Sequence, residues 1–319
     1  MKKLAIGIIT CNRAKIIRED LAAIVKPAKE YDIDIYIYDG STNRDTESVV
    51  KTYIEAGYNH IYYIHADDHL SVAESVYQRL EGVLFETEAK YVCLCSDHRV
   101  IKSNFYSEIM SYIDKDYDII MLHDNLLKGI HTYNSLTEFV NATIVSLTAW
   151  GATIIKKSLL APLEYREIYE AAPSFVVSSI YLRAIGKAEM FRAVTINTGR
   201  SLCVESAQYK EKSSSIKNMW TSWVVNWYRF VESLPAAYED IREGLYNRPD
   251  LEKGFFSFNE LLRQRSEGQF DWKKCHEYRN CVKKVVCLPY AVVFLIAVLP
   301  QSIARGLNRE GNKWNKILK

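Results

Sequence analysis

Apolar runs of strand length alternate with stretches of helical spacing through the first part of the chain, and this alternation restricts the folds open to it. The apolar runs cover residues 4–10, 33–39, 60–65, 91–95 and 117–123. Helical spacing of apolar residues fills 14–30, 44–56 and 69–87 between the first four runs. Strands alternating with helices predict a mostly parallel sheet covered by helices on both faces, which is an α/β fold.

Polar residues directly follow four of these predicted strands. The four clusters are Thr10-Cys11-Asn12-Arg13, Asp39-Gly40-Ser41-Thr42, His65-Ala66-Asp67-Asp68 and Ser96-Asp97-His98. In open α/β sheets ligands bind outside the carboxyl ends of the strands. The convergence of four polar clusters at that edge therefore predicts a ligand site there. The usual glycine-rich dinucleotide motif does not follow the first strand, and neither a P-loop nor a nucleophile-elbow motif occurs.

The middle of the chain continues the mixed pattern. It predicts a strand at 151–157, helices at 158–170 and 174–186, a strand at 188–196 and a polar loop at 201–216. From 219 to 231 three tryptophans and two valines fall on one helical stripe, which favours a helix packed on the rest of the chain over a contact with an acceptor or a membrane.

Charge is distributed unevenly along the 319 residues, whose net charge is +2. Residues 273–319 carry a net +8, which leaves −6 for residues 1–272. The apolar run 285–299 would span about 22 Å as a helix, short of a bilayer core of about 30 Å, and basic residues flank it on both sides. After Pro300, charges at three- and four-residue spacing share one helical face. We expect this tail to lie in an anionic membrane surface, the alternative being a helix docked on the rest of the chain.

Cysteine usage and the first residues indicate the compartment. Seven cysteines form no metal-binding C-x-x-C pair, and several lie in apolar runs, which is typical of buried thiols in a reducing compartment. The segment "MKKLAIGIITCNRAK" fits a strand better than a signal peptide, because Asn12 and Arg13 interrupt its apolar run. We therefore expect a cytoplasmic protein.

Three segments resemble motifs of family 2 glycosyltransferases. "IITCNRA" is similar to their T-x-N-R opening, "YDGSTNRD" to their D-D-G-S-x-D loop, and "YVCLCSDHRVIKSNFYSEI" to their D-x-D strand with the helix that follows. The resemblance covers about residues 3–200. It implies the GT-A fold, a Rossmann-like mostly parallel sheet flanked by helices, here with a helical C-terminal extension. It also implies a nucleotide-sugar donor and a divalent metal.

The chain departs from the family pattern at several acidic positions. Tyr38 replaces the first acid of the D-D pair, and Ser96 replaces the first acid of D-x-D. The E-D dipeptide that supplies the catalytic base in the family is missing near 173–177, where the chain has "PSFVV". Glu170 is the nearest acid, so we take it as the candidate catalytic base, the alternative being an exposed helix face.

The resemblance implies metal ligands after the fourth strand. Asp97 and His98 would hold Mn²⁺ or Mg²⁺, and an imidazole ligand favours Mn²⁺. Two alternatives remain open. Asp97 would cap the turn while His98 faces solvent, or Arg99 and Lys102 would neutralise the phosphates without a metal.

The resemblance also implies residues that bind the donor. The backbone near Thr10 and the Asp39 side chain would lie at the nucleobase, and Asn12 would also bind the donor. The Asp39 carboxylate suits the N3–H donor of uracil, so a UDP-sugar is expected. Arg13 and Arg79 would contact the pyrophosphate. The alternatives are a turn-capping role for the aspartate and plain surface positions for the two arginines.

These observations predict a membrane-associated, inverting glycosyltransferase at the inner face of the cell membrane. Residues 1–200 would form the catalytic GT-A domain, 201–272 a helical extension on the acceptor side, and 273–319 the membrane-associating tail. The expected partners are a nucleotide-sugar, a lipid-linked or oligosaccharide acceptor and an anionic membrane surface, with no nucleic acid. The alternatives are a sugar-1-phosphate nucleotidyltransferase, whose glycine-rich loop is absent, and a non-catalytic protein that binds nucleotide-sugar or glycan.

Overall fold

The computed structural model describes most of the chain, which forms two compact units. The described residues are 2–66, 72–97, 99–102, 104–123, 126–151, 153–160, 165–199, 203–205 and 219–308. The first unit comprises residues 1–166 and 180–212, and the second comprises 167–179 and 213–319. The border at 179/180 lies within a helix, and the expected division of function near residues 200 and 272 stays a prediction.

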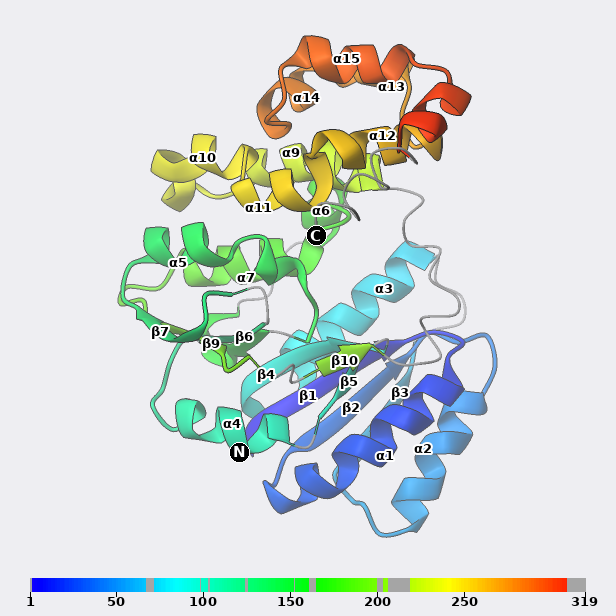
Figure 1. Ribbon diagram of the computed structural model, residues 1–319. Helices are drawn as coiled ribbons and strands as arrows, with labels where there is room; N and C mark the ends of the chain where they lie inside the picture. Colours follow the sequence, from blue (N-terminus) through cyan, green and yellow to red (C-terminus); the bar gives the residue numbers. More distant parts are fainter. Residues whose placement is uncertain are drawn as a thin grey trace. The chain divides into compact units, whose positions relative to one another are not determined.

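An eight-stranded sheet is the centre of the first unit (Figure 1). Its strand order is β3-β2-β1-β4-β8-β6-β9-β7. The strands are β1 (Lys2–Thr10), β2 (Asp34–Asp39), β3 (Ile61–His65), β4 (Ala89–Ser96), β6 (Ile119–Leu122), β7 (Gly129–Tyr133), β8 (Thr153–Lys156) and β9 (Ala193–Asn197). Strands β1 to β4 pair in parallel, whereas β8 is antiparallel to both of its neighbours. A small second sheet pairs β5 (Arg99–Ile101) with β10 (Cys203–Glu205).

Helices and helical turns connect the strands of the first unit. They are α1 (Ala14–Glu30), α2 (Asp45–Glu55), α3 (Val72–Glu81), the π-helical turn η1 (Gly82–Glu86), α4 (Asn104–Ile113), α5 (Leu136–Thr143) and two 3₁₀ turns, η2 (Ser146–Thr148) and η3 (Lys157–Leu159). Two further helices lie across the borders of the units, α6 (Tyr165–Ala171) and α7 (Val176–Ile185).

The sheet is covered on both faces, which explains why its strands read as continuous apolar runs. Alternate residues of β1 (Leu4, Ile6 and Ile8) join one buried core with residues of α1 and α4. The opposite face meets η1, where Gly7 allows a close approach because a Cβ atom there would lie 2.2 Å from a methyl group of Val83. Figure 1 shows α1 and α2 together on one face of these strands.

The expected α/β fold is therefore confirmed. The predicted helix at 14–30 coincides with α1, and the ends of the predicted strands differ from the observed ones by at most two residues, except that β9 begins at Ala193 and not at 188. The predicted helix at 69–87 ends instead in the π-helical turn η1. Strand β7 was not predicted, and the expected loop at 201–216 lies largely outside the described residues.

Short helices build the second unit. They are the π-helical turn η5 (Thr221–Asn226), α9 (Trp227–Glu232), the 3₁₀ turn η6 (Ala236–Ile241), α10 (Arg242–Tyr246), α11 (Pro249–Leu251), the π-helical turn η7 (Glu252–Phe256), α12 (Phe258–Ser266), α13 (Trp272–Glu277), α14 (Arg279–Val285) and α15 (Tyr290–Val298). The tryptophan stripe predicted for 219–231 lies in the core of this unit. Trp220 and Trp227 are at most 1% exposed, and Phe175 packs edge-on against Trp227.

The described part of the tail packs on its own unit and keeps an apolar face exposed. Arg265 Nε donates to the Leu299 carbonyl at 2.9 Å, and Ala304 is fully buried. Exposed apolar side chains follow from α15 onward: Leu295, Val298, Ile303 and Leu307. No single helix in the described ranges is long and apolar enough to cross a membrane. One pair, Tyr290–Val298 with Gln301–Asn308, passes that test together but is bent by 112°.

Candidate functional site at the carboxyl edge of the sheet

The carboxyl ends of β1, β2, β3 and β4 meet at one edge of the sheet, as predicted. The register pairs Thr10 with Asp39, and Asp39 with His65, on neighbouring parallel strands. Strand β4 lies on the other side of β1, so that Ser96 pairs with Ile9. The described members of the four polar clusters therefore lie along one line across four strands.

Asp97 is buried at this edge and paired with two donors. Thr10 Oγ1 donates to Asp97 Oδ2 at 2.8 Å, and Arg13 Nη1 lies 2.5 Å from Asp97 Oδ1. The Asp97 residue is only 3% exposed, whereas the Arg13 side chain is 42% exposed. Asp97 thus fixes one end of a partly exposed arginine side chain, a suitable arrangement for contacting an anionic ligand.

Asn12 joins the loop after β1 to the loop after β2. Its backbone has a positive φ of 55°, a conformation that asparagine tolerates better than most residues. The Asn12 N–H donates to Ser41 Oγ at 2.7 Å, and Asn12 Oδ1 accepts from the Thr42 N–H at 3.1 Å. These bonds hold two of the polar clusters in a fixed relation.

Asp39 is fully buried and accepts three hydrogen bonds. Its Oδ1 accepts from the backbone N–H of Ser41 at 2.9 Å and from the Ser41 hydroxyl. Its Oδ2 accepts from the Tyr63 hydroxyl at 2.9 Å. Burial and this bond to Asp39 raise the pKa of Tyr63, so the phenol keeps its proton. An ionised carboxylate offers about four acceptor positions, and hydrogen bonds from the described residues occupy three of them, which leaves one on Oδ2 within that part of the chain.

Arg79 of α3 is buried beneath the same loops. Its Nη1 donates to the Thr10 carbonyl at 2.7 Å and its Nε to the Ser75 carbonyl at 2.9 Å. Gly40 makes room for it, because a Cβ atom at that position would lie 2.8 Å from the Arg79 guanidinium carbon. Burial lowers the pKa of Arg79, an effect that the neighbouring Cys11, Asp39 and Asp97 oppose. The structure therefore places a buried cation under the edge.

Asp20 is a buried acid that the sequence reasoning did not single out. It lies on α1 at 2% exposure, and neither carboxyl oxygen has a hydrogen-bond partner in the described part of the chain. Burial, with a further contribution from the negative charges of Asp97 and Glu19, raises the pKa of Asp20 to about 8. The carboxyl group is consequently neutral at pH 7.

The described residues do not by themselves form the expected divalent-metal site. Within the ranges that the structure covers, no three His, Cys, Asp or Glu side chains come together in a way that could hold a metal ion. Asp97 accepts one hydrogen bond on each oxygen, from Thr10 and from Arg13, and its role as a metal ligand stays a prediction. The other expected ligand, His98, lies outside the described residues.

The structure brings together most of the residues predicted for the donor. Thr10, Asn12, Arg13, Asp39, Arg79 and Asp97 form one hydrogen-bonded cluster with their neighbours. Glu170 belongs to α6 in the second unit, where it is exposed, and its role as a base stays a prediction. Asp67 and Asp68 lie outside the described residues.

Sequence reasoning assigned no role to three residues that support this edge. Ser41 was visible in the D-G-S loop, whose serine is placed to bond back to the aspartate two residues before it. Asp20 was visible as a polar residue at helical spacing from Ile17, Leu21 and Ile24 on the apolar face of α1. No sequence signal marks Tyr63, because its contact with Asp39 depends on the pairing of β2 with β3.

Comparison with solved structures identifies the architecture. Staphylococcus aureus TarS 1–349 superimposes with a TM-score of 0.56 over 89% of this chain and 81% of its own, at 15% identity. The same protein in complex with UDP-GlcNAc gives 0.54 over 91% and 82%, at 16% identity. The chain has the GT-A fold. Pyrobaculum calidifontis mannosyltransferase PcManGT, solved with GDP-Man and Mn²⁺, gives 0.51 over 98% and 83%, at 13% identity.

Sequence comparison adds nothing to this structural likeness. No protein-family model matches the chain, and no curated protein matches it by sequence. The resemblance to GT-A glycosyltransferases therefore rests on the fold and on the motifs in the loops after β1, β2 and β4.

Proposed function

We propose that the protein is a glycosyltransferase that takes a sugar from a nucleotide-sugar, a UDP-sugar by preference, and transfers it with inversion to a lipid-linked or polymeric cell-surface glycan. The observation that carries this proposal is the cluster at the carboxyl edge of a GT-A sheet. Two buried carboxylates, Asp39 and Asp97, lie there on either side of Thr10, and two arginines lie close to them.

Asp39 supports the preference for uracil. In the structure its Oδ2 accepts only from the Tyr63 hydroxyl among the hydrogen bonds described. We infer that the uracil N3–H uses the second acceptor position of this oxygen, or displaces the Tyr63 hydroxyl from the first. Either way the ligand donates to a buried carboxylate, and charge-assisted hydrogen bonds of this kind contribute about 1.5–3 kcal/mol.

The arginines support the proposed chemistry. When the acceptor hydroxyl attacks the anomeric carbon, the nucleoside diphosphate leaves with its full negative charge. Positive groups fixed in advance near that charge stabilise the transition state. We assign the stabilisation of this charge to Arg13, which Asp97 holds in place. The buried Arg79 adds a second positive charge close to it. Glu170 is our candidate for the base that removes the proton of the acceptor hydroxyl.

A divalent cation remains a prediction for this protein. PcManGT was solved with Mn²⁺, but the described residues here do not compose a metal site. If Mn²⁺ or Mg²⁺ is required, transfer by the full chain stops in excess EDTA and returns when the metal is added back. Full transfer in EDTA would show that the cationic side chains suffice.

A thermal-shift screen of UDP-, GDP- and dTDP-sugars, with and without Mn²⁺, tests the proposal directly. We expect a UDP-sugar to raise the melting temperature most, because a ligand that binds only the folded state stabilises it. A binding UDP-sugar is then incubated with glycan acceptors, and release of UDP is measured. Binding with no transfer to any acceptor would favour the non-catalytic alternative. No shift with any nucleotide-sugar would remove the proposal.

We also propose that the second unit attaches the protein to the inner face of the cell membrane. Support comes from the exposed apolar side chains of the bent helix pair, among them Leu295, which is 63% exposed. Basic residues precede the pair in α13 and α14, and more follow it in 309–319, outside the described residues. Apolar insertion together with positive charge is the usual basis of peripheral binding to anionic lipid.

Flotation with liposomes tests this attachment with the folded chain. Replacing Leu295 and Ile303 by serine, both exposed, is expected to reduce binding to anionic liposomes, while UDP binding is retained. Salt is expected to weaken the attachment of the unaltered chain without abolishing it, since the apolar contact is not screened. Equal flotation of the variant and the unaltered chain would contradict the proposal.

A further inference from the structure

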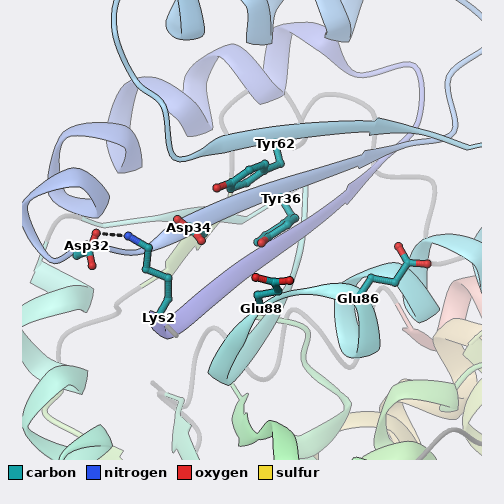
Figure 2. A pocket seen from close by; sticks show the side chains of 7 residues that line it. All are labelled: Lys2, Asp32, Asp34, Tyr36, Tyr62, Glu86 and Glu88. Atoms are coloured by element: carbon teal, nitrogen blue, oxygen red, sulfur yellow. Dashed lines mark hydrogen bonds and ion pairs between the residues drawn. The ribbon is translucent and has the colours of Figure 1, made fainter.

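A second polar pocket lies at the amino edge of the same sheet, opposite the candidate donor site. It encloses about 530 Å³ and is lined by Lys2, Asp32, Asp34, Tyr36, Tyr62, Glu86 and Glu88. A volume of this size lies within the range of small-molecule binding sites. Figure 2 shows the two tyrosine rings on one side of the pocket, with Glu86 and Glu88 on the other.

The tyrosines form an aromatic wall. Tyr36 on β2 and Tyr62 on β3 are register partners, and their rings stack with centroids 4.7 Å apart at 17°. Tyr62 is 41% exposed, so much of its ring faces solvent. The Tyr36 hydroxyl bonds to the backbone of Glu88, which fixes the ring. Because part of the Tyr62 ring stays in water after folding, this fixed aromatic surface is available to a ligand.

The carboxylates differ in how far they are already used. Lys2 pairs with Asp32, and Asp34 Oδ1 lies 3.0 Å from His60 Nδ1. Glu86 and Glu88 are exposed on the opposite side of the pocket, and Glu86 already accepts a hydrogen bond from the hydroxyl of the buried Tyr38. Four carboxylates against one lysine make the pocket negative, so it offers many hydrogen-bond acceptors and disfavours anionic ligands.

The pocket and the cluster at the carboxyl edge lie at different ends of the strands. Lys2 begins β1 and Thr10 ends it, so roughly 26 Å separates these two residues. Tyr36 is nearer: it lies three residues before Asp39 on β2, roughly 10 Å along the strand, and its side chain is on the opposite face of the sheet. The pocket is therefore distinct from the donor site.

We propose that the amino-edge pocket binds an uncharged saccharide segment of the acceptor, which packs the C–H face of a sugar ring on Tyr62 and donates its hydroxyls to Glu86 and Glu88. The identification of the ligand as part of an acceptor rests on the proposed function. An aromatic surface and acceptor oxygens on opposite walls match the two kinds of surface that a pyranose ring presents. The pocket would hold a long acceptor at a second point, which raises its effective concentration at the donor site.

Saccharide binding by the full chain tests the pocket. The probes are neutral oligosaccharides of hexose and of N-acetylhexosamine, with dextran sulfate as the anionic comparison, and binding is followed by NMR line broadening of the sugar. We expect Tyr62→Ala to weaken binding about tenfold and Tyr62→Phe to retain it, since the ring is preserved. Glu88→Gln is expected to weaken binding as well, whereas the matched exposed variant Glu55→Gln on α2 does not.

The outcomes separate this inference from the proposed function. A chain that binds UDP but none of the neutral probes overturns the pocket and leaves the donor site standing. Equal binding by Tyr62→Ala and the unaltered chain, or tighter binding of dextran sulfate, also overturns it. Saccharide binding that depends on Tyr62 in a chain that binds no UDP supports the pocket and rejects the transferase. With a long acceptor, Tyr62→Ala is expected to raise KM roughly tenfold relative to a short one while kcat is unchanged.

Discussion

Acidic residues at the two edges of the sheet differ in their exposure to solvent. At the carboxyl edge Asp39 and Asp97 are at most 3% exposed and accept hydrogen bonds from fixed donors. At the amino edge Glu86 and Glu88 are exposed around an open pocket. Glu88 directly precedes β4 and Asp97 directly follows it, so this strand alone does not cause the difference.

The difference follows from the loops and helices at each edge. At the carboxyl edge the chain turns directly into α1 and α2, and the backbone of these turns supplies donors such as the Ser41 N–H. Burial then makes each acid sensitive to its partners, because an unpaired buried charge is costly. At the amino edge Asp34 is also buried and paired with His60, but water solvates Asp32, Glu86 and Glu88, so single substitutions of these three are expected to change stability little.

The largest change in stability expected from this contrast comes from the ionisation of the buried Asp20. Its folded pKa of about 8 lies above the ordinary 3.8, so the unfolded chain ionises first and stability is lost as pH rises from about 4 to about 8. Between pH 5 and pH 8 the loss attributable to this one group is about 4 kcal/mol. Asp20→Asn is expected to abolish that part of the pH dependence in urea unfolding.

Asp45→Asn on the exposed surface of α2 is the matched control and should keep the pH dependence of the unaltered chain. If the free energy of unfolding depends on pH equally in Asp20→Asn and in the unaltered chain, Asp20 has a partner in the folded state. The strongest support for the contrast between the edges would then be removed.

The next effect concerns Asp97. Asp97→Asn removes the negative charge that holds Arg13, and charge-assisted bonds of this kind contribute about 1.5–3 kcal/mol. We expect sugar transfer to fall about ten- to a hundredfold, measured as UDP release at saturating acceptor. Glu55→Gln on α2 serves as the control with unchanged activity. Transfer within twofold of the unaltered rate in Asp97→Asn would remove Asp97 from the site.

The smallest effect is expected near the amino edge, at Asp116. Side-chain bonds from Lys156 and Lys90, both at 2.8 Å, lower the pKa of Asp116 to about 2. This stabilisation is present above about pH 4 and is lost as pH falls towards 2. Since the Asp116 side chain is 48% exposed, Asp116→Asn is expected to cost under about 1 kcal/mol at pH 6. A loss of more than about 2 kcal/mol in the free energy of unfolding of Asp116→Asn, measured in urea, would contradict the proposed difference between the edges.

The sequence predicted the sheet and the residues at its carboxyl edge because both depend on local pattern. Apolar runs identify strands buried on both faces, and the polar residues after them must lie at the strand ends. The antiparallel strand β8 lies between β4 and β6, a position that depends on long-range pairing. The amino-edge pocket was missed for the same reason, since Tyr36 and Tyr62 come together only when β2 pairs with β3.

The central claim is that the carboxyl edge binds the uridine of a nucleotide-sugar donor through Asp39. Calorimetric titration of UDP and GDP into the full chain and into Asp39→Ala tests it most directly. We predict that UDP binds at least about tenfold more tightly than GDP and that Asp39→Ala removes this preference, because the buried carboxylate accepts from the uracil N3–H. Equal affinities for UDP and GDP, or an unchanged UDP affinity in Asp39→Ala, would contradict the account.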